Sequence, residues 1–320
     1  MRRINWVGRG IACLWAFTVV FWPRQGDPSG HDDSERQGSG ERLYQSGSTR
    51  AGLGLTGARF YQSNDGKKRW SIESKFAELY QTENTAFMEH VTARFFSERT
   101  GNVITTKSRY GRSLVDREQV ELTGGVSIRP PQGYLFTTEQ ILYDGKAGSL
   151  HSDAAVQMKG PREDYPTMTL RGVGLDANIE TEHFRLKRQV WAQKQIKGRG
   201  EKLRITSRSG EFFTMENRAV FVNRARATLP DVTIEGDLME IGLQNSSESL
   251  RATGNVRVKS RDRVGTSQGA IFELSGRRIV LDGEADVVDA SGNRLEGRRI
   301  VIFTDSERVE VDTARGGGLQ

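Results

Sequence analysis

Apolar and polar residues alternate with a period of two along most of the chain beyond residue 60. Between residues 120 and 128 the apolar positions flank Gly124, and between residues 250 and 258 they flank Gly254 in the same way. Period two is the signature of a strand with one buried face. A glycine inside such a strand indicates a bulge or a close backbone approach. The pattern therefore predicts half-buried strands that are interrupted near their centres.

The alternation recurs in a loose repeat in which each unit contains two strands. The units begin at residues 72, 104, 136, 170, 205, 234, 265 and 295, at spacings of 29 to 35 residues. They predict about sixteen short antiparallel strands, and no βαβ alternation indicates a parallel sheet. Residues 70–87 also show the spacing of a helix face, so a helix is the alternative there. We predict an all-β, antiparallel open β-jelly roll or V-shaped solenoid with an apolar interior.

The first sixty residues differ from the rest. Three arginines within the first nine residues precede an apolar run over 11–22, which is shorter than the roughly 20 residues of a full span. Basic residues before an apolar run place the N-terminus in the cytoplasm. We expect one N-terminal transmembrane helix within residues 1–22, with a cleaved signal peptide as the alternative. Residues 23–60 are rich in Gly, Ser and charged side chains, which predicts a flexible linker.

The composition mainly excludes classes of function. The 320-residue chain is 35% hydrophobic and 28% charged, and its net charge of +6 is spread among mixed signs, which gives little support to nucleic-acid binding. Its four histidines lack metal-ligand spacing, and its one cysteine, Cys13, lies in the apolar run. We therefore expect no metal, no cofactor and no enzymatic activity. A secreted hydrolase is an alternative, and it would need a polar cleft with convergent carboxylates.

Basic residues are concentrated in one segment, residues 185–202, which contains seven lysines and arginines. Two interpretations remain open. The segment is either a solvated crossing between two halves of the body or a site for phosphate groups or an acidic partner.

Three strings in the first half of the body resemble a known family. They are WSIESKFAELY at 70–80, VELTGGV at 120–126 and GYLFTTEQILY at 133–143. The order and phase of these strings resemble LptC, the single-pass periplasmic subunit of the lipopolysaccharide export ABC transporter. The resemblance defines an LptC-like β-jelly roll over residues 61–195.

The second half resembles the soluble bridging protein of the same system, LptA, with its OstA-like repeats. The match is carried by LRITS at 203–207, TGNV at 253–256 and LEG at 295–297, and it defines a domain over 196–320. The pattern departs from the family at Gly125, where Asn is usual. It departs again at residues 219–223, which lack the Gly-Asn-Val ending.

The resemblance implies a carrier without catalytic activity. Its β-jelly-roll groove would hold acyl chains and pass lipopolysaccharide from the inner-membrane ABC transporter toward the outer membrane. The chain would be a single-pass inner-membrane protein with its bulk in the periplasm. Lipopolysaccharide, the transporter subunits and a periplasmic bridge protein or outer-membrane receiver domain are the expected partners. The alternative is a structural or adhesive β-solenoid with a filled core.

The alternation also assigns candidate residues to the groove and to one sheet edge. The expected groove wall consists of Ile72, Phe76, Val91, Ile104, Val120, Leu122, Val126, Ile128, Leu135, Ile141, Val256 and Val258. A terminal strand presents unpaired N–H and C=O groups to a partner. The candidate docking edge therefore consists of Val301, Phe303, Val309 and Val311 in the last strand pair.

Overall fold

The computed structural model describes residues 3–6, 17–20, 52–64, 66–80, 84–161, 168–196, 200–243, 249–274, 276–306 and 308–312. Within the expected anchor, β1 (Arg3–Trp6) and β2 (Phe17–Val20) are two short strands that pair with each other. The rest of the anchor and residues 23–51 of the expected linker lie outside the described residues. Among those described, no helix is long and apolar enough to cross a membrane.

Eighteen further strands form one antiparallel sheet. They are β3 (Leu53–Asn64), β4 (Lys67–Tyr80), β5 (Thr85–Phe96), β6 (Val103–Leu114), β7 (Gln119–Arg129), β8 (Leu135–Asp144), β9 (Ser149–Lys159), β10 (Met168–Asn178), β11 (His183–Gln195), β12 (Lys202–Ser207), β13 (Ser209–Phe213), β14 (Arg218–Thr228), β15 (Val232–Gly242), β16 (Ser249–Ser260), β17 (Arg263–Glu273), β18 (Arg278–Val288), β19 (Arg294–Phe303) and β20 (Val309–Asp312). One 3₁₀ turn, η2 (Val115–Arg117), joins β6 to β7.

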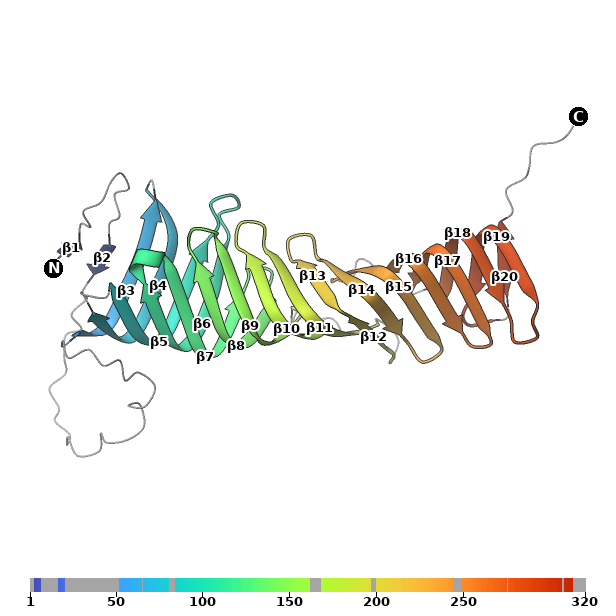
Figure 1. The fold of residues 1–320 in the computed structure, drawn as a ribbon, viewed down its shortest axis with the longest axis horizontal. Helices are drawn as coiled ribbons and strands as arrows, with labels where there is room; N and C mark the ends of the chain where they lie inside the picture. The colour runs from blue at the N-terminus through green and yellow to red at the C-terminus, as the bar shows by residue number, and fades with distance from the viewer. Residues whose placement is uncertain are drawn as a thin grey trace, which may run out of the picture.

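The strands pair in the order of the sequence, from β3 with β4 to β19 with β20. β12 and β13 lie end to end between β11 and β14, so together they act as one strand. Figure 1 shows the strands stacked along the long axis, with β3 at one end and β20 at the other. The eight repeat starts fall in β4, β6, β8, β10, β12, β15, β17 and β19. The predicted antiparallel repeat is confirmed, and the helix alternative for residues 70–87 is wrong.

The expected linker ends earlier than the sequence suggested. β3 begins at Leu53, and its Leu55, Ala58 and Phe60 side chains are buried against the sheet. These apolar residues are spaced unevenly within a polar stretch, so neither the composition nor the alternation indicated a strand there. Residues 53–60 therefore belong to the folded body.

Most of the long strands bend near their centres, where the register with the next strand shifts. In β7 the inward side chains pass from Leu122 to Val126, and the register with β8 shifts at the same place. In β16 the bend lies at Gly254 and Asn255, whose φ angles are 76° and 47°. The Asn255 amide donates a hydrogen bond to Asp237 Oδ2 at 2.7 Å. The predicted central bulges are therefore present in these strands. They form because residues with left-handed backbone angles turn the strand there.

The two departures from the family pattern are compatible with this bend. Gly124 and Gly125 both have positive φ, at 81° and 79°. In β14, Asn223 and Arg224 adopt φ of 64° and 56° without a glycine. Asn tolerates the left-handed region better than most residues.

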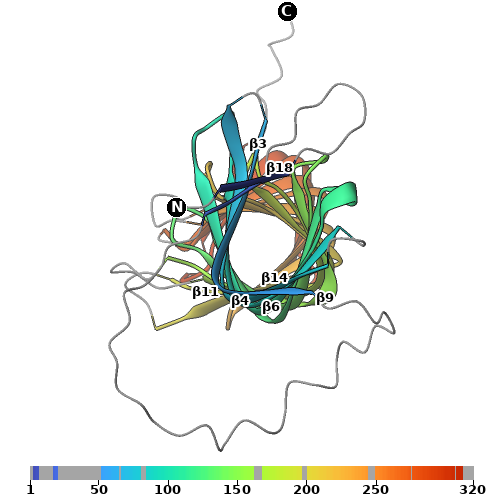
Figure 2. The ribbon, with the colours of Figure 1, turned by 90° about the vertical axis from the view of Figure 1, so that its left-hand side faces the viewer.

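The bends roll the sheet so that one face points inward. Figure 2 shows the strands surrounding a common axis. One cluster of buried apolar side chains extends from Leu55 to Ile302. The sheet also continues across the expected domain boundary at 195/196, because β11 pairs with both β12 and β13. The two halves therefore share one sheet and one core.

The bend can be tested at Gly254. A Cβ there would lie 2.6 Å from Asp237 Oδ2, and φ is positive. Gly254→Ala should lower the free energy of unfolding by about 1–3 kcal/mol, measured by urea denaturation. Gly54→Ala is the control, because nothing lies within 4 Å of its Cβ. Equal stability of the two variants would contradict the assigned role of the bend.

Candidate functional site

The inner face of the roll is the candidate site. Ten of the twelve expected wall residues point inward and are at most 2% exposed. These ten are Ile72, Val91, Ile104, Val120, Leu122, Val126, Ile128, Ile141, Val256 and Val258. The alternation therefore assigns their side chains to the correct face of the sheet.

Two of the expected wall residues are not buried. Phe76 is 41% exposed and lies under the Lys75 ammonium, whose Nζ is 5.2 Å from the ring centroid. Leu135 is only half-buried, and its neighbour Phe136 is fully buried instead. In β4 the inward positions step from Ser74 to Ala77, so a strict period of two fails at the bend.

The alternation did not predict the aromatic part of the interior. Phe136 and Phe184 stack at 4.4 Å between centroids, and Phe95 meets Tyr143 at 4.3 Å. Phe136 opens a repeat unit, so the repeat itself carried a usable signal. All four rings are at most 2% exposed. The inner face is therefore apolar, partly aromatic and closed to water in this conformation.

The roll is closed along a line where two rows of turns meet, which we call the seam. One row contains the turns after β5, β7 and β11, and the other contains the turns after β8, β10, β13 and β17. Glu180, in the turn after β10, accepts hydrogen bonds from Ser97 Oγ at 2.8 Å, Glu98 N at 3.0 Å and Arg99 N at 2.9 Å. The Arg99 guanidinium donates to the Glu180 carbonyl oxygen from Nε at 3.0 Å and Nη2 at 2.8 Å.

Further contacts cross the seam, one of them from Arg69 near the start of β4. They are Arg69 Nη2 to Gly145 O at 3.4 Å, Asn102 Nδ2 to the Glu182 carboxylate, Tyr134 Oη to Asn217 Oδ1 at 3.2 Å, and the ion pair of Arg277 with Glu201 at 3.7 Å. Burial raises the pKa of Tyr134 to about 12, so its hydroxyl stays a donor. The seam contacts are hydrogen bonds and ion pairs between turns, whereas backbone ladders join the strands of the walls.

The carboxyl of Glu180 is tuned to remain ionised. Its partial burial alone would raise the pKa. The hydrogen bonds from the backbone of Arg99 and Glu98 and from Ser97, with the charge of Arg69, outweigh this and lower the pKa below its ordinary value of 4.5. The negative charge therefore favours the closed seam.

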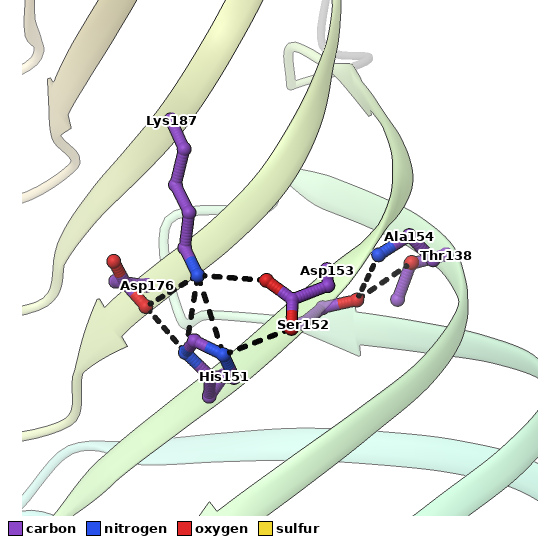
Figure 3. Close-up of polar contacts among 7 residues, drawn as sticks. All are labelled: Thr138, His151, Ser152, Asp153, Ala154, Asp176 and Lys187. Atoms are coloured by element: carbon purple, nitrogen blue, oxygen red, sulfur yellow. Dashed lines mark hydrogen bonds and ion pairs between the residues drawn. The ribbon is translucent and has the colours of Figure 1, made fainter.

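A polar cluster lies on the outer side of β9, β10 and β11 (Figure 3). His151 Nδ1 is 2.6 Å from Asp176 Oδ1, and Lys187 Nζ is 3.0 Å from Asp153 Oδ1 and 3.5 Å from Asp176 Oδ1. The hydrogen bond from Lys187 lowers the pKa of Asp153. The lysine lies between the carboxylates, so they do not form an acid–base pair.

Metal binding receives no support from the described side chains. Within the described ranges, no group of three His, Cys, Asp or Glu side chains is placed to hold a metal ion. Cys13 lies outside these ranges.

The basic segment 185–202 divides among different environments. Lys187 joins the outer cluster, whereas Lys194 is buried and donates to Gly242 O at 2.7 Å. Residues 197–199 lie outside the described part. The described basic side chains therefore do not form a single phosphate site, and β11 carries the sheet from one half to the other.

The candidate docking edge lies at the end of the sheet. Val301, Phe303 and Val309 are half-buried, and Val311 is 36% exposed. The inner face of the last pair is supplied by Ile300 and Ile302, which lie opposite Val311 and Val309. Among the described residues, the registers pair β20 with β19 alone.

The seam predicts a response to acid. Because the pKa of Glu180 is lowered, its contribution is complete above pH 4.5 and is lost as the pH falls through the lowered pKa. As the pH falls through that range, the amides of residues 97–102 should lose more of their protection against hydrogen exchange, relative to the intrinsic rate at the same pH, than the amides of the core strands do. At neutral pH, Glu180→Gln should accelerate exchange there roughly two- to tenfold.

The control for this prediction is Glu216→Gln. Glu216 binds Arg218 near its own turn and does not cross the seam. If both variants exchange at the same rate in residues 97–102, Glu180 does not hold the seam.

Two family models match successive parts of the chain. Residues 57–195 match the family "Lipopolysaccharide-assembly, LptC-related", and residues 205–308 match "LptA/(LptD N-terminal domain) LPS transport protein". No curated protein sequence matches the chain. Among solved structures, one similar chain is LptH, described as the LptA homologous periplasmic component of the conserved lipopolysaccharide transport device from Pseudomonas aeruginosa. It is 20% identical, with a TM-score of 0.33, over 36% of this chain and 85% of that chain.

The two family matches follow one another along a single continuous sheet, in the order in which the sequence places them. Residues 57–195 therefore form an LptC-related segment and residues 205–308 an LptA/LptD N-terminal segment, which makes the chain a non-enzymatic component of the lipopolysaccharide transport bridge.

Proposed function

We propose that the interior of the roll carries the acyl chains of lipopolysaccharide along the long axis, from the LptC-related segment to the LptA-type segment. The observation that supports this is the single apolar cluster, which extends from Leu55 in β3 to Ile302 in β19. An acyl chain offers no hydrogen bonds, so it can move between neighbouring apolar side chains without a specific site. A carrier of this kind needs no catalytic residue.

The energy of solvation explains why such a path is needed. Moving an acyl chain of about 12 carbons from an apolar phase into water costs roughly 9 kcal/mol, at about 0.8 kcal/mol per CH₂. A lipid with several chains multiplies this barrier. A continuous apolar interior removes it and leaves the direction of movement to a source of energy at one end.

The interior is closed in the conformation described, so uptake requires an opening. The seam is the place where opening costs least, because a turn-to-turn hydrogen bond contributes only about 0.5–1.5 kcal/mol net. Separating two strands of a wall would instead break a whole backbone ladder. A few seam contacts are therefore weaker than the gain from covering one acyl chain, although side chains such as Phe136 must move aside.

The direction of transport and the partners are further parts of the proposal. The LptC-related segment would receive lipopolysaccharide from the inner-membrane ABC transporter. The edge of β20, formed by Val309 and Val311, would then pair with a periplasmic bridge protein or the receiver domain of the outer membrane. Support comes from the missing register partner on that edge among the described residues and from the tendency of open edges to add a strand.

Anchoring in the inner membrane is likewise proposed. Three arginines before the apolar run 11–22 support a single span with the body in the periplasm. Recovery of the full-length protein with inner membranes would support the proposal, and recovery as a shortened soluble species would contradict it.

The closed interior also favours a second candidate, a structural β-solenoid. Leu122, Ile128 and Phe136 are 0% exposed, as expected of a filled core. A structural protein would not take up lipid at all. The two candidates are therefore separated by the same measurement.

The groove is tested by photo-crosslinking to lipopolysaccharide. Photoreactive side chains at Leu122 and Val126, which point inward, should capture the lipid. The same groups at Thr123 and Ser127, which lie on the other face, should not. Each variant must first show the circular dichroism spectrum and melting behaviour of the parent. Equal labelling of both pairs would reject the interior as the carrier, and no labelling at all would favour the structural solenoid.

The docking edge is tested with proline. Phe303 N donates to Arg308 O, so antiparallel alternation directs Glu310 toward β19 and the N–H groups of Val309 and Val311 toward the free edge. Val311→Pro should abolish crosslinking of residues 300–311 to partner proteins in cells while the body stays folded, because proline removes a donor. Val311→Thr should retain it. A folded Val311→Pro protein that still crosslinks would show that the edge does not dock.

A further inference from the structure

A polar cleft lies on the seam in the first half of the roll. It has a volume of about 420 Å³ and is formed by the start of β4 and the turns after β5, β8 and β10. Its charged side chains are Lys67, Arg69, Glu98, Arg99, Lys146 and Glu180. The cleft therefore lies on the outer surface, over residues that make the seam contacts.

The cleft carries an excess of positive charge. Four cations and two carboxylates give a net charge of +2 (4 − 2). Glu98 is already bound to Arg69 at 2.6 Å, and the Glu180 carboxylate accepts its three seam hydrogen bonds. Arg99 donates to a neutral carbonyl oxygen. Two carboxylates that are already engaged leave the excess charge available to an anion.

Two of the cations are unengaged and held on opposite sides of the seam. In the described part of the chain, the ammonium groups of Lys67 and Lys146 join no ion pair. Lys146 is fixed in its turn because Asp144 Oδ1 accepts hydrogen bonds from the backbone N of Lys146 at 2.9 Å and of Ala147 at 3.0 Å. Lys67 starts β4, next to the paired Arg69. The backbone positions that carry these two lysines are thus set before any ligand arrives.

We propose that this cleft binds the phosphate group of an anionic amphiphile while the acyl chains of the same molecule enter the interior through the seam. This deepens, and rests on, the proposed lipid-carrying function. A phosphate monoester carries about −1.5 to −2 charge at pH 7, which matches the excess in the cleft. Lysine and arginine are the side chains that bind phosphate best.

The second basic cleft differs in its position. It has a volume of about 530 Å³ and lies over β16 to β19, with Arg251, Arg298 and Arg299 at its surface. It includes Asp282, which faces Arg299 across the β18–β19 pair. It lies along the bends of the strands, and its residues belong to neither row of seam turns. It therefore provides a matched control for charge.

The test measures binding of the full-length protein to neutral maltoside micelles that carry a bis-phosphorylated lipid, or the same lipid after phosphatase treatment. The parent should prefer the phosphorylated lipid. Lys67→Glu with Lys146→Glu should weaken that binding at least about tenfold and leave the dephosphorylated lipid unaffected. Arg251→Glu with Arg298→Glu changes the net charge equally and should retain the preference.

Three results would overturn the site. They are equal binding of the two lipids by the parent, an unchanged preference in the lysine variant, and loss of the preference in the arginine variant alone. In each case lipid still binds, so the proposed carrier function stands while the cleft fails.

If neither lipid binds, the carrier function itself fails. The phosphate site is then tested separately, by footprinting lysines in the presence of inorganic phosphate. Phosphate should then slow the acylation of Lys67 and Lys146 relative to Lys107 and Lys259, two exposed lysines outside both clefts. Protection confined to Lys67 and Lys146 supports the site, and uniform acylation rejects it.

Discussion

The bend near the centre of the long strands is the constraint on which the rest of the molecule depends. An antiparallel sheet with one apolar face must cover that face, and here the sheet covers it with itself by folding at the line of bends. Left-handed residues such as Gly254 and Asn255 make the fold possible. Their conformational cost is of order 1–3 kcal/mol for a non-glycine residue. It is small beside the free energy gained when a strand buries its apolar area, at about 25 cal/mol per Å².

Folding the sheet in this way creates two kinds of boundary. The walls are joined by backbone ladders from strand to strand. The seam is joined by a few contacts between turns, among them the three hydrogen bonds from Arg99 to Glu180. The walls therefore resist opening far more than the seam. A body that must admit a lipid and still stay folded requires this difference. The basic cleft lies at the same place, so recognition of a charged head group and entry of the chains would be coupled.

Sequence reasoning predicted the repeat because alternation is local and each unit repeats it. It failed at Phe76, because the three-residue step at the bend of β4 cannot be read from a strict period of two. It missed β3, whose Leu55 and Phe60 lie in a polar stretch. It gave no sign of the seam, because Glu180 and Arg99 are 81 residues apart and meet only through the tilt and stacking of the intervening strands. Contacts of that kind follow from the folded geometry and from no pattern along the chain.

If lipid enters the interior across the seam, fastening the seam shut should prevent its uptake. In a Cys13→Ser background, Thr100→Cys and Thr181→Cys place one thiol in each of the two turns that Glu180 joins, and a short bis-maleimide can link them. One preparation then serves as its own control before and after linking. We expect the linked protein to keep its fold and to take up no lipopolysaccharide, while the unlinked protein takes it up. Equal uptake by the linked and unlinked protein would contradict it.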